Sequence, residues 1–411
     1  MRYSFTLASC LLLITAQLSA QQRQQTTAYA ITSSEKGNFN WTDVKQIDFA
    51  TGNVTRSVFE AKQTNLTVFS ARTGKEIKSL VQNGVTTNVN TPVASLAAAC
   101  AYDQRHNRLY YAPLFMNQLR YIDLDDKEPK MYYFDNETFT PATDLNNEAN
   151  HITRMVIAAD GDGYALSNDA NHLMRFTTGR KATISDLGAL KDDESNGDKS
   201  IHTKATSWGG DMIADAAGNL YVITAFRQVF KVNIQTKVAT WITEIKGLPT
   251  TFTTNGAVVD SEGFLIVSSA NTAEGYYKVD MHTWQGNRID IQGTVFNASD
   301  LANGNLAFSN DVPTVPLINR AVIRNEKFAL YPNPVVSNQV YVSFNIRETG
   351  RYTIQLLDLT GKVISEKIAV IANGAQVVPV NVKSNLAKGP YMVKVLSNSK
   401  KAVFTDKLIV E

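Results

Sequence analysis

The chain contains 411 residues, with 40 Lys and Arg against 38 Asp and Glu, so its formal net charge is +2. This balance excludes binding to bulk nucleic acid, which requires a concentrated basic surface. The chain carries 18 Phe and 16 Tyr, has many short runs of Val, Ile and Thr, and lacks a long stretch of helical periodicity. These features predict an all-β protein of two or three domains.

The first predicted element is a secretory signal peptide over residues 1–20. It begins with a positive charge, residues 7–16 form an apolar run, and the small residues of "LSA" end at Ala20. The run is shorter than the ~20 residues that cross a bilayer. A lipoprotein signal at Cys10 is the alternative, which we disfavour because most of the apolar run follows that cysteine. Cleavage after Ala20 leaves Cys100 as the single cysteine, which predicts a chain without an internal disulfide.

Residues 21–310 contain a repeated hairpin pattern, which predicts a β-propeller. In each copy a hydrophobic strand end is followed by an aspartate, a short polar turn and a second strand. An aspartate there bonds the backbone of its own turn, so each copy predicts a β-hairpin. A further strand follows each hairpin, and the aspartates recur every 45 to 57 residues, the spacing of four-stranded blades. The copies span 101–113, 158–169, 214–225 and 259–270, with the turn aspartates Asp103, Asp160, Asp215 and Asp260.

Weaker copies of the pattern flank these four. Residues 27–55 look like the second half of a blade and residues 298–310 like the first half, so we expect the chain start to complete the blade that its end begins. Residues 61–99 contain a strand-turn-strand pattern, which we interpret as a further blade. The predicted count is six blades, with seven as the alternative. "TNGAVVDSEGFLIVSS" and "GGDMIADAAGNLYVIT" resemble NHL-type and related six-bladed propellers over about 95–310, a fold that serves binders, lyases and hydrolases alike.

The candidate ligand-binding residues are polar side chains at the ends of the strands that should line the central channel of the propeller. Propellers of the gluconolactonase type gather Glu, Asn and Asp around calcium at such positions, and calcium requires six to eight oxygen ligands. No acidic residue recurs at one blade position here, so we predict no metal and no cofactor, with calcium as the alternative. The candidates are His151, Arg154, Asn168, Asp169, Asp211, Asn255 and Asn271.

The motif "DGDG" at 160–163 resembles the start of a calcium-binding loop. However, position twelve of such a loop is Asn171 where glutamate is required, and the repeat already explains Asp160 as a turn residue. The sequence contains no nucleophile elbow, phosphate-binding loop, dinucleotide-binding fingerprint or metal-binding histidine pair. We therefore predict no catalytic residue and lean against an enzyme, without excluding one.

The end of the chain predicts a second domain. Residues 311–326 carry two prolines and no alternation, which indicates a linker. Several short antiparallel strands within 327–411 predict a small β-sandwich of the immunoglobulin-like type. In its first clear strand, alternation places Val340, Val342 and Phe344 on one face.

This last segment closely resembles the C-terminal sorting domain of cargo proteins of the type IX (Por) secretion system of Bacteroidetes. The resemblance covers all of 327–411, and its prolines and glycines also have structural roles at the strand entry and in turns. The matching motifs are "FALYPNP" (328–334), "GRYTIQLLDLTGKVI" (350–364), "LAKGPYMVKV" (386–395) and "DKLIVE" (406–411). The residues assigned to the sorting signal are Tyr331, Pro332, Asn333, Pro334, Gly361, Gly389, Tyr391 and Lys407.

The resemblance implies an export route and a set of partners. The signal peptide would deliver the chain to the periplasm, and an outer-membrane translocon would recognise the sorting domain. A sortase-like peptidase usually cleaves such chains at the linker and often joins them to anionic lipopolysaccharide. From residue 327 onward, eleven Lys and Arg stand against five Asp and Glu, which is consistent with an anionic partner. We therefore expect a secreted or cell-surface protein.

The task of the propeller has several possible interpretations. The leading hypothesis is a non-enzymatic module that binds a protein or a glycan. One alternative is a propeller enzyme of the lyase type or of the calcium-dependent lactonase or esterase type. Another is an accessory component of the secretion or attachment machinery. Three or more convergent Asp, Glu, Asn or His side chains in the channel would favour the enzyme, whereas an apolar lining would count against it.

Overall fold

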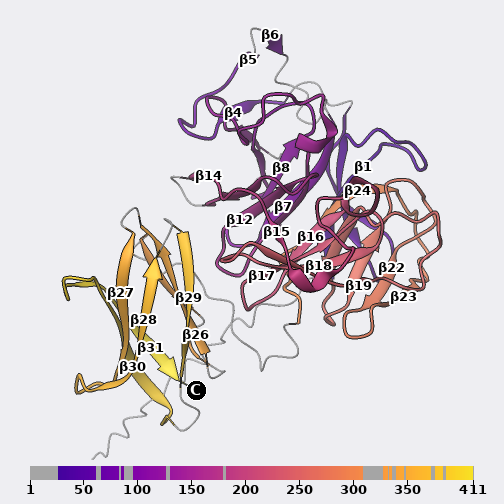
Figure 1. Cartoon of the computed structure of the whole chain (residues 1–411). Coiled ribbons are helices and arrows are strands. Elements are labelled where there is room, and N and C mark those ends of the chain that lie inside the picture. Colours follow the sequence, from indigo (N-terminus) through magenta and orange to yellow (C-terminus); the bar gives the residue numbers. More distant parts are fainter. Residues whose placement is uncertain are drawn as a thin grey trace, which may run out of the picture.

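The structure is a computed structural model, and nearly all of its elements are strands (Figure 1). Among the described residues no helix has the length and apolarity needed to cross a membrane. The predicted signal peptide and the predicted linker 311–326 lie outside the described residues. The structure describes residues 26–61, 66–82, 85–87, 96–125, 130–178, 182–308, 327–331, 333–335, 339–346, 349–371, 375–382, 386–410.

Residues 26–308, as far as they are described, form five sheets arranged as propeller blades, together with the small hairpin of β5 (Leu80–Gln82) and β6 (Val85–Thr87). From the axis outward, blade 1 contains β24 (Ala298–Ala302), β1 (Thr27–Thr32), β2 (Asp43–Asp48) and β3 (Val54–Phe59). Blade 2 contains β7 (Ala97–Asp103), β8 (Arg108–Pro113), β9 (Arg120–Asp123), β10 (Lys130–Tyr133) and β4 (Val68–Ser70). Blade 3 contains β11 (Ile152–Ile157), β12 (Gly163–Ser167), β13 (Leu173–Phe176) and β14 (Ile184–Asp186).

The remaining blades follow the same order. Blade 4 contains β16 (Asp211–Ala214), β17 (Asn219–Ile223), β18 (Gln228–Asn233), β19 (Val238–Glu244) and β15 (Lys191–Asp192). Blade 5 contains β20 (Gly256–Val259), β21 (Leu265–Ser268), β22 (Tyr277–Asp280) and β23 (Gln285–Arg288). The helical segments are the turns η1 (Glu148–Asn150), η2 (Glu194–Asn196) and α1 (Lys204–Ser207).

The inner strands contact one another in the closed order β24, β7, β11, β16, β20 and back to β24. The described residues therefore form five blades, and the predicted count of six, or seven, is not confirmed. The discrepancy arises in residues 61–99, which we had interpreted as a separate blade. There, β4 pairs in parallel with β10 and widens blade 2 at its outer edge, with Met131 opposite Val68.

The ring closes as the sequence predicted. Strand β1 pairs antiparallel with β24, so that Ala30 lies opposite Leu301 although the two are far apart in the chain. Blade 1 thus takes its inner strand from the end of the propeller sequence and its other three strands from the beginning. This pairing ties the two ends of the ring together through backbone hydrogen bonds.

The turn aspartates form the hairpins that the repeats predicted. Asp215 Oδ1 accepts the backbone N–H groups of Ala217 and Asn219, both at 2.9 Å. Asp260 Oδ1 accepts those of Glu262 at 2.8 Å and Phe264 at 2.9 Å. The carboxylate therefore satisfies two turn donors in each of these hairpins, which explains why an aspartate recurs at this turn in blades 2 to 5.

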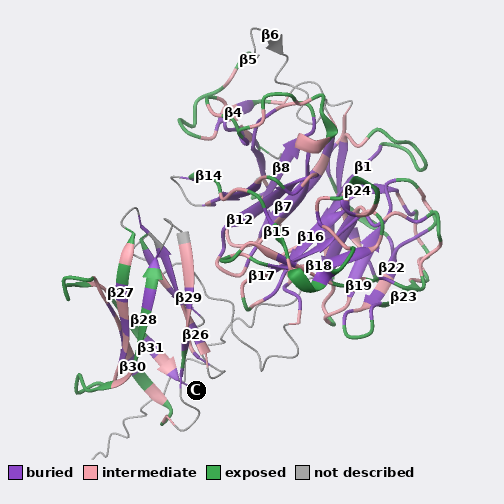
Figure 2. Ribbon diagram, in the orientation of Figure 1, coloured by how far each residue is buried: buried purple, intermediate pink, exposed green. Residues whose placement is uncertain are grey.

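Hydrophobic clusters fill the space between neighbouring blades, so each sheet buries both faces (Figure 2). Between blades 3 and 4, for example, Tyr164 and Leu166 pack with Met212, Leu220 and Phe230. Burial of this apolar surface is the main stabilising contribution to the ring. It also explains why the inner strands lack alternation and are apolar at most of their positions.

The C-terminal part is a two-sheet sandwich, as predicted. One sheet has the order β25 (Phe328–Tyr331), β26 (Gln339–Asn345), β29 (Ala375–Asn381). The other has the order β28 (Val363–Ile371), β27 (Gly350–Leu357), β30 (Gly389–Leu396), β31 (Ala402–Val410). Val340, Val342 and Phe344 are fully buried in the core between the sheets, so the predicted alternation is confirmed.

The two ends of this sandwich are bound to each other. Asn333 Nδ2 donates to the carbonyl oxygen of Lys407 at 2.5 Å, and the N–H of Ile409 donates to Asn333 Oδ1 at 2.8 Å. The N–H of Val335 also donates to the carbonyl oxygen of Ile409 at 2.6 Å. The opening motif and the last strand thus stabilise one another. Pro332, which precedes Asn333 in the opening motif, lies outside the described residues.

Asn333→Ala is expected to destabilise the sandwich by about 1 to 3 kcal/mol, because it removes two side-chain hydrogen bonds to the last strand. Thermal unfolding of the full chain, followed by a probe in the sandwich, measures this effect. The control Asn398→Ala changes an exposed turn residue and should leave unfolding unchanged. Equal effects of the two variants would show that Asn333 does not hold the last strand.

The other signal residues occupy turns and strand entries. Gly361 has φ +85° and Gly389 has φ +142°, values that other residues adopt only with strain. The Tyr391 hydroxyl donates to the carbonyl oxygen of Ala387 at 2.8 Å. These glycines therefore allow the backbone to turn sharply beside the buried face of the sheet.

Candidate functional site

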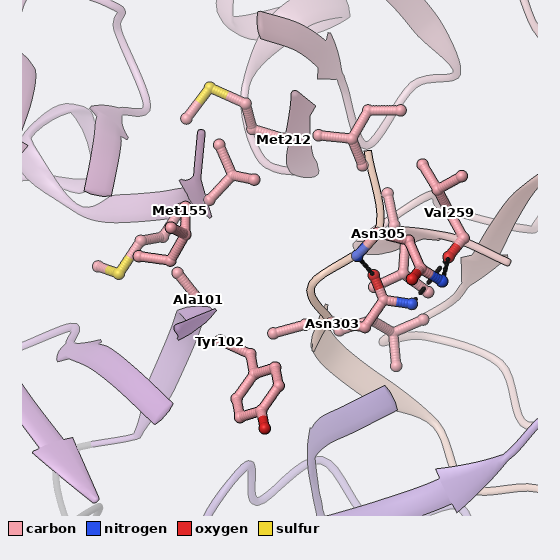
Figure 3. Close-up of a pocket in the computed structure, with 14 residues that line it drawn as sticks. Ala101, Tyr102, Met155, Met212, Val259, Asn303 and Asn305 are labelled. Carbon is pink, nitrogen blue, oxygen red and sulfur yellow. Dashed lines mark hydrogen bonds between the residues drawn. The ribbon is translucent and has the colours of Figure 1, made fainter. Parts of the chain in front are cut away.

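Side chains from all five inner strands surround a small cavity on the axis of the propeller (Figure 3). This cavity measures only ≈ 10 Å³. Its lining includes Ala101, Tyr102, Met155, Met212 and Val259. This space holds about one water molecule, whereas sites for small molecules measure roughly 300 Å³ or more. The described part of the chain therefore forms no ligand pocket at this end of the axis.

Two amides close this end of the axis. Asn303 Nδ2 and Asn305 Nδ2 donate to the carbonyl oxygen of Val259 at 2.8 and 2.9 Å (Figure 3). Residues in the C-terminal half of each inner strand line the cavity, so the hairpins that join first and second strands lie at this end of the ring. The loops that join second and third strands consequently lie on the opposite face, which we call the loop face.

A charged layer lies deeper on the axis, and it contains two of the predicted residues. Arg154, on β11, is completely buried, and its guanidinium donates to the carbonyl oxygens of Gly209 at 3.0 Å, Ser167 at 3.2 Å and Ser207. Burial lowers the pKa of Arg154 to about 9, although Asp169 and Asp211 act in the opposite direction. Arg154 thus binds blade 3 to the segment that enters blade 4.

Two consecutive glycines shape that entering segment. A side chain at Gly210, where φ is +92°, would place its Cβ 2.0 Å from the carbonyl oxygen of Ile223. Glycine is therefore required for the backbone to approach β17 so closely. Gly209 and Gly210 thus position two groups. One is the carbonyl oxygen of Gly209, which accepts from Arg154, and the other is the carboxyl group of Asp211.

Asp211 is also completely buried, and it is hydrogen-bonded to a residue that the sequence did not single out, Asp300 on β24. Burial raises the pKa of both carboxyl groups, that of Asp211 to about 7. Asp300 lies one position away from the repeat register of Asp211, so the repeats did not point to it. The available signal was a carboxylate inside an otherwise apolar inner strand.

The other predicted site residues form hydrogen bonds within loops and do not line the cavity on the axis. His151 Nε2 lies 2.8 Å from the carbonyl oxygen of Leu145. Asn168 Oδ1 accepts from Thr153 and from the N–H of Gly209, both at 2.8 Å. Asp169 accepts from Ser167 Oγ at 2.7 Å, and Asn255 Oδ1 accepts from the N–H of Ala270 at 3.0 Å. Asn271 is exposed, and its N–H donates to Ser269 Oγ. The structure therefore gathers only Arg154 and Asp211 of the predicted set at the axis.

The described residues contain no group of three His, Cys, Asp or Glu side chains that could hold a metal ion. In "DGDG", Asp162 forms an ion pair with Arg175, whose Nε donates to Asp162 Oδ2 at 2.9 Å. Asp160 accepts the hydroxyl of Tyr164 at 2.7 Å. Both carboxylates therefore form hydrogen bonds to side chains on the strands of blade 3.

The loop face carries exposed aromatic side chains, which sequence reasoning missed. Phe39, Phe115 and Phe226 have exposed fractions of 55%, 49% and 46%. They lie in the corresponding second-to-third-strand loops of blades 1, 2 and 4. All three side chains are exposed on the same face of the ring, each on a different blade. Nothing in the repeats distinguishes these loops from ordinary polar connections.

The fold is thus a β-propeller followed by a small β-sandwich. Residues 329–411 match the family model of the secretion system C-terminal sorting domain. The sandwich is this domain, which directs the chain through type IX secretion to the cell surface or the medium, as the sequence predicted.

No curated protein matches the sequence. Solved structures with a similar fold include PorZ, an essential bacterial surface component of the type-IX secretion system of Porphyromonas gingivalis, at 14% identity and a TM-score of 0.29. That match covers 93% of this chain and 51% of the other, so this chain spans about half of PorZ. A streptogramin B lyase is 13% identical over 66% of this chain and 85% of its own, with a TM-score of 0.36. A putative 6-phosphogluconolactonase from Bacteroides uniformis is 13% identical over 86% and 99%, with a TM-score of 0.35. These values are too low to transfer an activity.

Proposed function

We propose that the chain is an exported binding module whose propeller recognises a protein ligand through its loop face. The observation that carries this proposal is the exposure of Phe39, Phe115 and Phe226 on corresponding loops of one face. The sorting domain supports it, because an exported module meets its ligand at the cell surface or in the medium.

The axis is a poorer place for recognition than the loop face. Its cavity holds about one water molecule, and the amides Asn303 and Asn305 in its lining are already hydrogen-bonded to Val259. The charged groups deeper on the axis, Arg154 and Asp211, are completely buried and already hydrogen-bonded. An axial enzyme site would need space for a substrate beside convergent polar groups, and the cavity next to Asn303 and Asn305 is too small for one.

A protein ligand fits the loop face better than a glycan does. Recognition of sugar hydroxyls needs polar side chains with free hydrogen-bonding capacity beside an aromatic ring. On this face the side chains of His151 and Asn168 already form hydrogen bonds with backbone carbonyl and N–H groups of the loops. The exposed phenylalanines have no polar atoms, and aromatic side chains are enriched in the cores of protein–protein interfaces.

The triple variant Phe39→Ser, Phe115→Ser, Phe226→Ser is expected to bind at least about tenfold more weakly than the wild type, because each lost aromatic anchor costs on the order of 1 to 2 kcal/mol. The assay measures binding of labelled chain 21–411 to cells of the producing bacterium that lack the gene. The control Val54→Ser with Ile242→Ser removes side chains of 38% exposure from outer strands and should bind like the wild type.

Treatment of the cells distinguishes the two ligand classes. Protease treatment should abolish binding, whereas periodate oxidation of glycans should leave it intact. Binding that survives protease and is lost after periodate would assign a glycan ligand instead. If the triple variant and the wild type bind equally, the loop face is not the recognition surface.

A further inference from the structure

Asp211 and Asp300 form a carboxyl pair that joins the inner strands across the axis. Asp211 lies at the start of β16, and Asp300 lies on β24, the strand that closes the ring. Both side chains are completely buried and hydrogen-bonded to each other. The pair is therefore placed at the seam where the two ends of the propeller sequence meet.

Backbone N–H groups from the same strands and from two neighbouring strands bind the pair. Asp211 accepts the N–H groups of Met212 and Ala257, one at each oxygen and both at 2.6 Å. Asp300 accepts the N–H of Leu301 at 2.8 Å and, at its other oxygen, that of Cys100. The pair thus connects β7, β16, β20 and β24, four strands that follow one another only through the ring closure.

Charge balance indicates a single proton between the two carboxyl groups. Two buried carboxylates in contact cannot both ionise at ordinary cost, so one of them keeps a proton and donates it to the other. The remaining negative charge is offset by Arg154 on β11. The other titratable groups nearby are Cys100 on β7 and Asp169, which acts on Arg154, while β20 carries none.

We propose that this shared proton is a clasp that keeps the propeller ring closed at the β24 seam. With the proton present, the carboxyl pair links four inner strands by one side-chain hydrogen bond and two backbone hydrogen bonds, from Ala257 and Cys100. Without it, two adjacent carboxylates repel each other at the centre of the ring, and the seam is the part that opens.

The direction of the pH dependence follows from linkage. Burial raises the pKa of Asp211 to about 7 and also raises that of Asp300, whereas an aspartate of the unfolded chain titrates near ~3.9. Between these values the closed ring binds more protons than the open chain, so closure weakens as the pH rises. Each proton that the closed ring binds in excess increases the opening equilibrium by up to about tenfold per pH unit, so opening should increase progressively from pH 5 to pH 9.

The thiol of Cys100 reports this opening directly. Cys100 is the one cysteine of residues 21–411, is completely buried, and gives its N–H to Asp300. The experiment measures the labelling rate of this thiol in native chain 21–411 from pH 5 to pH 9. Division by the rate of the urea-unfolded chain at the same pH removes the effect of thiolate formation. The protection should fall progressively across this range in the wild type, by about tenfold or more.

Asp300→Asn and Asp211→Asn should each make the protection nearly independent of pH, because an amide needs no shared proton. The matched control Asp260→Asn removes a turn carboxylate at the rim and should keep the wild-type slope. A flat wild-type profile would overturn the proposal, and so would a wild-type slope in both axial variants. If an axial variant fails to fold, the wild-type and Asp260→Asn profiles still decide.

Discussion

A chain that ends at Asn325 is expected to fold and to remain in the periplasm. The interblade clusters contain no described residue of 327–410, and the sandwich has a core of its own. Removal of the sorting domain should therefore cost little propeller stability while it removes the export signal. Fractionation, together with antibody labelling of intact cells, measures the distribution, and we expect surface labelling to fall to background.

The matched control is the full chain with Phe39→Ser, Phe115→Ser and Phe226→Ser. It alters the loop face but keeps the sorting domain, so it should reach the surface in wild-type amounts. Surface exposure of the truncated chain would refute the assignment of export to residues 327–411. Loss of the truncated chain from every fraction would instead mean that the propeller depends on the sandwich for folding.

Arg154→Met is expected to destabilise the propeller by about 3 to 5 kcal/mol. The change leaves the carbonyl oxygens of Ser167, Ser207 and Gly209 without a donor. It also leaves the negative charge of the Asp211–Asp300 pair without a nearby cation. Urea unfolding at pH 7, followed by tryptophan fluorescence, measures the shift in midpoint.

Lys204→Met is the control for the loss of a positive charge. Lys204 pairs with Glu148 at 2.6 Å, but both side chains are more than half exposed. Such surface pairs contribute about 0 to 1 kcal/mol, so the control should unfold almost like the wild type. Similar midpoints for Arg154→Met and the wild type would contradict the role given to Arg154 in linking blades 3 and 4.

The sequence could predict those features that local chemistry determines. The turn aspartates Asp215 and Asp260 form their hairpins through contacts within five residues, and the alternation at Val340 to Phe344 reports its buried face directly. The closure of the ring followed from two incomplete copies of one repeat. Each of these inferences used residues close in the chain or a repeated pattern.

The blade count and the site could not be predicted in the same way. Strand β4 joins blade 2 by a parallel pairing with β10, about sixty residues further along the chain, and no local signal specifies that partner. The sequence placed Arg154 and Asp211 near the axis but not their burial, because burial depends on how closely the blades approach. The roles proposed for Asp300 and the exposed phenylalanines depend on how strands and loops of different blades are arranged in space, which the local sequence does not specify.

The central claim is that the loop face binds a protein at the cell surface. Site-specific photo-crosslinking on intact cells tests it most directly, with a benzophenone amino acid placed at Phe115 in one chain and at Ile242 in another. Ile242 is exposed on an outer strand and serves as the matched position. The account predicts a discrete protein adduct from position 115 and none from position 242. Equal adducts from both positions, or an adduct from position 242 alone, would contradict it.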